Sequence, residues 1–146
     1  MTAIIGIDPG ASGAMCVLSG GTVQIIKLDS PGIIAFLKRL AADGSRCFIE
    51  NISASNKWGK SGIHQMRSIS ENFGYWCGVL DAVEIQFEKV ESKTFELVCG
   101  CKLPVYDYAR QKEANFQRAK ELYPNTQIFK YAADAVLIAY FGTLRT

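Results

Sequence analysis

Hydrophobic and polar positions in the first part of the chain follow strand patterns. A short β-branched apolar run covers residues 3–8, and a second apolar run covers 14–18. Gly20-Gly21 is a hairpin signal, and residues 22–28 then alternate between apolar and polar side chains. The pattern therefore predicts three antiparallel strands at the start of the chain.

A helix and a fourth strand are expected next. Ser30-Pro31 predicts the helix start, with serine as the N-cap and proline in the first helical position. The apolar face of this helix is predicted to consist of Ile33, Ile34, Leu37 and Leu40. The helix should end near 43–44, and residues 46–50 should form a fourth strand. The intervening helix makes this connection a crossover, so we expect the fourth strand to lie parallel to the first and close to it.

Helical spacing dominates the second half of the chain. A long helix is predicted from residue 63 to about 83, with apolar positions at Ile63, Met66, Ile69, Phe73, Cys77 and Leu80. Gly74 and Gly78 share one face of it, which indicates close packing in the core or at a subunit interface. The remaining predicted elements are a strand over 84–90 and helices over 92–99, 108–123 and about 132–144.

Composition and charge narrow the class of protein. The chain has 146 residues, of which 49% are hydrophobic and 21% charged, so we expect residues 1–146 to form a single globular domain. The net charge of +2 neither favours nor excludes a polyanionic partner. No signal-peptide pattern is evident, and the apolar stretch over 132–144 is too short to span a bilayer. We therefore expect an intracellular protein of the cytoplasm or nucleoid.

Five scattered cysteines fit this expectation. Their number is odd and they form no C-x-x-C pair, which favours small core residues in a reducing compartment. Cys99-Gly-Cys101 is a weak signal for a soft metal, because no further ligands accompany it.

Three acidic residues carry the candidate chemistry. Asp8 and Glu50 each end an apolar strand, and adjacent strands lie about 5 Å apart, so the two carboxylates are expected to share one cation. Asp134 is the one charged residue in the apolar start of the last helix. Taken singly, Asp8 is equally consistent with an ordinary turn and with an acidic site that handles phosphate, and Asp134 is consistent with a helix N-terminus that favours negative charge. Together, the three provide the hard oxygen ligands that Mg²⁺ or Mn²⁺ requires.

Basic and aromatic residues alternate in the region before the last helix. The basic residues are Lys93, Lys102, Arg110, Lys112, Arg118, Lys120 and Lys130, and the aromatic ones are Phe95, Tyr106, Tyr108 and Phe116. Such a run is either a solvated face or, beside an acidic metal site, a track for a phosphate backbone.

The polar loop over 51–62 holds a second group of candidate DNA contacts. Trp58 is either anchored on the core or positioned to wedge or stack at a DNA junction, with Lys57 and Lys60 beside it. His64, the only histidine, is interpreted as structural in preference to a general base.

The order of these elements and acids resembles the RNase H-like fold, an α/β fold with a five-stranded mixed sheet flanked by helices. Within it, the whole chain is similar to the RuvC-type Holliday junction resolvases, most of all to the compact resolvases of phages and related viruses. The similarity is carried, in order, by Gly6-Ile7-Asp8-Pro9-Gly10, Phe48-Ile49-Glu50-Asn51 and Ala133-Asp134-Ala135. It implies a homodimeric, metal-dependent endonuclease that nicks two strands of a four-way DNA junction.

The resemblance also implies roles for individual residues. Asp8, Glu50 and Asp134 would hold two Mg²⁺ ions, with Mn²⁺ as a substitute, and Lys112 would contact the scissile phosphate. The dimer contact would fall in the helix near 62–83. DNA contacts are expected from Lys57, Trp58, Lys60, Lys93, Arg110 and Lys112. The chain departs from the family pattern at Tyr131, where the family often has a further acid.

Three alternatives stay open at this stage. The first is a branched-DNA-binding protein with weakened or lost nuclease activity, and the second is an endonuclease of broader flap and fork specificity. The third is an ATPase of the actin and sugar-kinase type, which also begins with an acidic glycine turn. That class needs a second phosphate loop and a second domain, and neither is found in the 146 residues.

Overall fold

Five strands form one mixed sheet in the order β3-β2-β1-β4-β5 in the computed structural model of the chain. The strands are β1 (Ile4–Asp8), β2 (Ala14–Ser19), β3 (Thr22–Lys27), β4 (Arg46–Glu50) and β5 (Gln86–Val90). The first three are antiparallel neighbours, whereas β1, β4 and β5 run parallel to one another. The predicted mixed sheet, with its fourth strand parallel to the first, is therefore confirmed.

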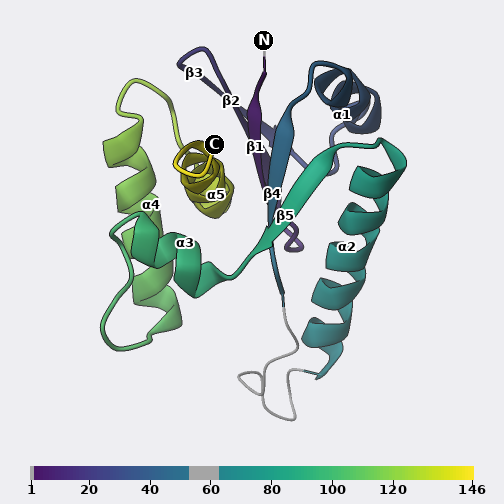
Figure 1. The fold of residues 1–146 in the computed structure, drawn as a ribbon. Helices are drawn as coiled ribbons and strands as arrows, with labels where there is room; N and C mark the ends of the chain where they lie inside the picture. The colour runs from purple at the N-terminus through teal and green to yellow at the C-terminus, as the bar shows by residue number, and fades with distance from the viewer. Residues whose placement is uncertain (1, 53–62) are drawn as a thin grey trace.

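The helices cover both faces of this sheet. The structure describes residues 2–52 and 63–146, with residues 63–66 described by their backbone alone. Figure 1 shows α1 (Ile33–Ala42) and α2 (Ile63–Ala82) on one face, and α3 (Ser92–Val98), α4 (Tyr108–Leu122) and α5 (Ala133–Thr143) on the other. Among the described helices, none combines the length and the apolar character needed to cross a bilayer.

Side chains from both faces of the central strands are buried. Ile5 and Ile7 of β1 pack toward α1 and α2, while Phe48 of β4 packs toward α5. Strands covered on both faces read as continuous apolar runs, which explains the sequence pattern of β1 and β4. The sheet is the middle of three layers, and the carboxyl ends of β1 and β4 lie at the same end of it because the two strands are parallel.

Two glycines let α5 lie close to the sheet. A Cβ atom at Gly6 would meet the backbone of Ala135 and Ala139 and lie 2.9 Å from the Ala139 side chain. A Cβ atom at Gly142 would lie 2.5 Å from the Phe48 ring. Small residues on both elements thus bring the start of α5, and Asp134 with it, next to β1.

Gly6→Ala should therefore destabilise the protein by about 2–3 kcal/mol, because the added methyl group overpacks a backbone contact that has no room to adjust. Lys38→Ala, at an exposed position of α1, is the control, since it also ends in alanine but adds no atom to the core. It should change the stability by less than about 0.5 kcal/mol. Urea unfolding measures both changes, and equal stability for the two variants would contradict the close packing of α5 on β1.

Some predictions of local structure are wrong. The start of α1 is not at Ser30-Pro31: the helix begins at Ile33, and its N-cap is Gly32, with a left-handed φ of 77°. Ile34 is 40% exposed and does not belong to the buried face. The fifth strand begins at Gln86 instead of residue 84, because Glu84 adopts a positive φ of 60°.

The long helix α2 is present where the sequence predicts a helix, but its buried face is wider than the prediction. Trp76 and Val79 are buried together with Leu80 against the sheet. Gly74 and Gly78 are exposed, and no other described part of the chain approaches the position of a Cβ at either one. Of the two interpretations of these glycines, core packing against the described residues is therefore wrong, and a subunit interface stays a prediction.

Candidate metal centre

Three carboxylates from separate segments meet at the carboxyl ends of β1 and β4. Asp8, Glu50 and Asp134 each offer a ligand oxygen, and these oxygens all lie within 4.8 Å of one another. This is the only such group of three acidic, histidine or cysteine side chains in the described residues. The sequence prediction that these three acids come together is thus correct in geometry.

The turn after β1 fixes the Asp8 side chain. The Gly10 N–H donates to Asp8 Oδ1 at 3.1 Å, and the Gly13 N–H donates to the Gly10 carbonyl at 2.9 Å. A Cβ atom at Gly13 would lie 2.7 Å from the Gly10 carbonyl oxygen, so glycine is needed there for space. These two amides hold the turn itself.

The end of β4 positions Glu50 beside Asp8. The Asn51 N–H donates to the Val90 carbonyl at 2.8 Å, and Asn51 Nδ2 donates to Glu91 Oε1 at 2.9 Å. These bonds keep the end of β4 tied to the end of β5. The Glu50 carboxylate therefore extends from a fixed backbone at the carboxyl edge of the sheet.

Asp134 lies at the start of α5, is 4% exposed and has nitrogen donors on both of its oxygens. The Lys112 ammonium of α4 donates to Asp134 Oδ2, and Asn115 Nδ2 donates to Asp134 Oδ1 at 2.9 Å. Lys112, predicted to contact a phosphate, is thus paired directly with the third acid. α4 therefore supplies both the positive charge and the neutral donor that a buried carboxylate requires.

Asn115 is the centre of a buried polar network that the sequence reading missed. Its side chain is 0% exposed and donates to Glu96 Oε1 at 3.4 Å as well as to Asp134. Asn115 Oδ1 accepts from Gln111 Nε2 at 2.9 Å, and Gln111 Oε1 accepts from the Leu103 N–H at 2.9 Å. No buried side-chain nitrogen or oxygen in the described residues is without a partner. The network therefore holds the Asp134 side chain in place from the side of α3 and α4.

Two of the three acids, Asp8 and Glu50, have raised pKa values. Burial and the charge of Asp134 raise the pKa of Asp8 to about 6, although Lys112 and the Gly10 N–H act to lower it. Burial, followed by the charges of Asp8 and Asp134, raises the pKa of Glu50 well above its usual value. Burial acts to lower the pKa of Lys112, but the carboxylates of Asp134 and Glu50 outweigh it and raise the pKa. A bound cation would relieve this repulsion.

Metal-free protein should lose stability as the pH rises from about 4 to about 6. The folded state holds a proton on Asp8 that the unfolded chain releases near the ordinary pKa of 3.8, so the folded state binds more protons in this window. Asp8→Asn should therefore raise the stability of metal-free protein above pH 7 by about 1–2 kcal/mol, with allowance for solvent screening at this partly exposed site. Thermal unfolding in a chelator measures the change. Asp81→Asn, at an exposed position of α2, is the control, and a lower Tm for Asp8→Asn would contradict the repulsion between the acids.

The other predicted DNA-contact residues fall into two groups. Lys93 and Arg110 are exposed near the starts of α3 and α4. Lys57, Trp58 and Lys60 lie outside the described residues, as does the side chain of His64. Part of the basic run has structural roles instead: Arg118 Nε donates to the Cys99 carbonyl at 2.7 Å, and Lys130 pairs with Glu113 at 3.0 Å. The run is therefore not one continuous track.

Tyr131 contributes no ligand to the acids. Its ring stacks on Phe129 with centroids 5.6 Å apart, and the Lys27 ammonium lies 5.2 Å from its centroid. The Cys99 and Cys101 thiols donate to the carbonyls of Leu137 and Glu96, so they behave as buried core groups.

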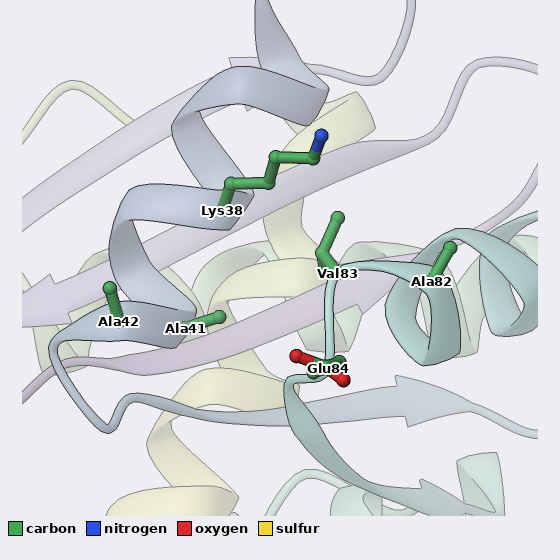
Figure 2. Close-up of a pocket in the computed structure, with 6 residues that line it drawn as sticks. All are labelled: Lys38, Ala41, Ala42, Ala82, Val83 and Glu84. Carbon is green, nitrogen blue, oxygen red and sulfur yellow. The ribbon is translucent and has the colours of Figure 1, made fainter.

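A hollow elsewhere on the surface has no comparable donor set. It lies between the end of α1 and the end of α2, lined by Lys38, Ala41, Ala42, Ala82, Val83 and Glu84 (Figure 2). The chain leaves α1 here to begin β4, so the hollow is at the opposite end of that strand from Glu50. The acidic centre is therefore the candidate functional site.

The residues of the acidic centre fit a divalent cation of the Mg²⁺ class. Such ions take hard oxygen ligands, commonly one or two protein carboxylates with water completing the shell. Asp8 and Glu50 supply these oxygens from fixed backbone positions, and no sulfur or imidazole ligand accompanies them in the described residues. An acidic triad that can bind a metal ion is thus present.

No protein-family model matches the sequence, and no curated protein matches it either. Solved structures do resemble it. The Thermus thermophilus RuvC structure has a TM-score of 0.61 and 13% sequence identity, with 99% of this chain and 98% of that chain covered. T. thermophilus RuvC in complex with a Holliday junction substrate has a TM-score of 0.60 and 12% identity, with 98% and 96% covered. The chain therefore has the RNase H-like fold of the RuvC structures, as the resemblance in its sequence implies.

Proposed function

We propose that residues 1–146 form a single nuclease domain that hydrolyses phosphodiester bonds in branched DNA with the help of a divalent metal ion. The observation that carries this proposal is the meeting of Asp8, Glu50 and Asp134 within 4.8 Å at one edge of the sheet. The four-way junction is the proposed substrate, since the chain shares its fold with a RuvC bound to a Holliday junction substrate. Such an enzyme would act inside the cell, on the nucleoid.

The proposed metal is Mg²⁺, with Mn²⁺ as a substitute, held by the carboxylates of Asp8, Glu50 and Asp134. When bound, it would supply Lewis-acid activation of the attacking water and of the leaving 3′ oxygen. Lys112 brings a fixed ammonium group to the edge of the acidic centre, where it would attract the scissile phosphate. Asn115 keeps Asp134 in one orientation through the 2.9 Å bond to Oδ1.

The proposed DNA contacts surround this centre. Lys93 and Arg110 are exposed and would bind flanking phosphates, which would make affinity fall with added salt. Lys57, Trp58 and Lys60 are proposed to meet the junction centre, where an aromatic ring can stack on an unpaired base.

The direct test is cleavage of labelled DNA by the purified protein. Four-way, three-way, flap and linear substrates of the same sequence are compared with Mg²⁺, with Mn²⁺ and in a chelator. The proposal expects paired nicks in the four-way junction with either ion and none in the chelator. Equal cleavage of flaps and forks would favour the broader endonuclease instead.

Tyr131 favours a second candidate function, a branched-DNA-binding protein with lost nuclease activity. Its ring faces Phe129 and Lys27, and it adds no carboxylate to the centre. Tight binding of four-way junctions without nicking in either ion would support this candidate and overturn the nuclease proposal.

Homodimer formation through α2 is also proposed. Gly74, Gly78 and the 57%-exposed Tyr75 form an uncovered surface on this helix, and small residues permit a close approach of a second copy. Gly78→Glu should convert a dimer into a monomer in sedimentation equilibrium, because it places a bulky charge in the contact. Lys38→Glu, exposed on α1, is the control. A wild-type monomer, or a variant that remains dimeric, would contradict this contact.

A further inference from the structure

The Lys112 ammonium lies at the edge of the acidic centre and is paired with one of its three carboxylates. It donates to Asp134 Oδ2 and lies 5.6 Å from the centroid of the Tyr108 ring, so both a carboxylate and an aromatic face hold it. The other oxygen of Asp134 accepts from Asn115 at 2.9 Å. Asp134 is therefore a carboxylate whose two oxygens both have nitrogen donors, in contrast to Asp8, which accepts from the Gly10 N–H on Oδ1.

The charge of the centre limits how many further cations it can take. Three carboxylates and one ammonium leave two negative charges, which a single divalent cation neutralises. A second divalent cation would give the centre an excess of positive charge while Lys112 stays paired with Asp134. No fourth carboxylate joins the group within the described residues, because Glu96 is turned to Asn115 and Tyr131 is uncharged.

We propose that the centre binds one divalent ion, held chiefly by Asp8 and Glu50, and that the Lys112 ammonium takes the place of a second ion beside Asp134. This inference rests on the proposed metal centre and departs from the pair of ions that the family resemblance implies. Lys112 would then neutralise Asp134 and offer its remaining protons to a phosphate oxygen.

Ion counting by calorimetry tests this without any DNA. Titration of Mn²⁺ into the purified full chain should give one ion per chain for the wild type. Lys112→Met keeps the length of the side chain but removes the competing charge, so its affinity for Mn²⁺ should rise about tenfold or more. Lys38→Met, in the hollow at the far end of β4, should bind like the wild type. Two ions of comparable affinity in the wild type, or unchanged affinity in Lys112→Met, would overturn the inference.

A second variant covers the case in which Lys112→Met fails to fold, since it leaves a buried carboxylate without its counter-charge. Lys112→Met combined with Asp134→Asn removes both charges of the pair. It should still bind one Mn²⁺ within about tenfold of the wild-type affinity, because Asp8 and Glu50 are intact. Loss of binding in this double variant would overturn the assignment of the ion to Asp8 and Glu50.

The outcomes separate this inference from the nuclease proposal. One bound ion without junction cleavage would leave the inference standing and overturn the proposed function. Junction cleavage with two bound ions would support the nuclease proposal and overturn the inference. A wild-type protein that binds no Mn²⁺ would overturn both.

Discussion

Asp8→Asn should lose metal-dependent cleavage of a four-way junction by about a thousandfold or more while it still binds the junction. Asp8 lies between Glu50 and the turn of Gly10, and its carboxylate is proposed to hold the metal directly. Loss of a metal ligand removes several kcal/mol of transition-state stabilisation, and about 4 kcal/mol corresponds to a thousandfold in rate. The substituted amide keeps an oxygen that can accept from Gly10, so the turn should persist.

The measurement is single-turnover cleavage of labelled junction DNA, with binding followed separately by anisotropy. Asp81→Asn on α2 is the charge-matched control and should cleave at the wild-type rate. The same Asp8→Asn protein should be more stable than the wild type without metal, so a loss of activity through unfolding is distinguishable. Wild-type cleavage by Asp8→Asn would show that the acidic centre is not the active site.

Asn115→Leu should destabilise the protein by about 3–5 kcal/mol and reduce cleavage at least tenfold where the protein remains folded. The change is similar in volume, but it leaves Asp134 Oδ1 and Glu96 Oε1 without the Asn115 donor in a buried place, while Gln111 Nε2 keeps only its bond to the Cys101 carbonyl. Each buried polar group left unpaired costs about 1–3 kcal/mol. Asp134 would also lose the donor that fixes its orientation.

Urea unfolding and junction cleavage below the unfolding transition measure the two effects. Gln117→Leu makes the same kind of change on the exposed side of α4 and should alter stability by less than about 0.5 kcal/mol. If Asn115→Leu behaved like Gln117→Leu in both assays, the buried network could not be what positions Asp134.

The sheet and the acidic triad could be predicted from the sequence because each depends on local signals. β1 and β4 are short apolar runs that each end in an acid, and the helix between them forces a parallel pairing. Because neighbouring parallel strands end on the same side of the sheet, Asp8 and Glu50 are then expected to lie close together. Asp134 could be added because a lone charge in an apolar helix requires a partner.

The polar network behind Asp134 could not be predicted in the same way. Gln111, Asn115 and Glu96 lie among charged residues, where a polar side chain normally indicates a solvated face. Gln111 and Asn115 are one turn apart with Ala119 next on the same face, and all three are buried. The helical spacing of these three residues is evident in the sequence, but only the packing of α4 on α5 shows that this face of α4 points inward.

Local signals also failed where tertiary geometry decided the outcome. Ser30-Pro31 has the residues of a helix start, yet the chain makes a further turn and α1 begins after Gly32. Gly6 has the pattern of an ordinary strand glycine. A side chain is excluded at this position by the backbone of α5, which lies more than a hundred residues later in the chain. The contact of Lys112 with Asp134 also depends on how α4 and α5 pack together, and its contact with DNA stays a prediction.

A crystal structure of the protein grown with Mn²⁺ would locate the metal most directly, through the anomalous signal of that ion. The signal should lie between the carboxylates of Asp8 and Glu50, within about 2.0–2.5 Å of an oxygen from each, and it should vanish in Asp8→Asn crystals. A signal only elsewhere on the protein, or one that persists in Asp8→Asn, would contradict a metal-dependent active site at the ends of β1 and β4.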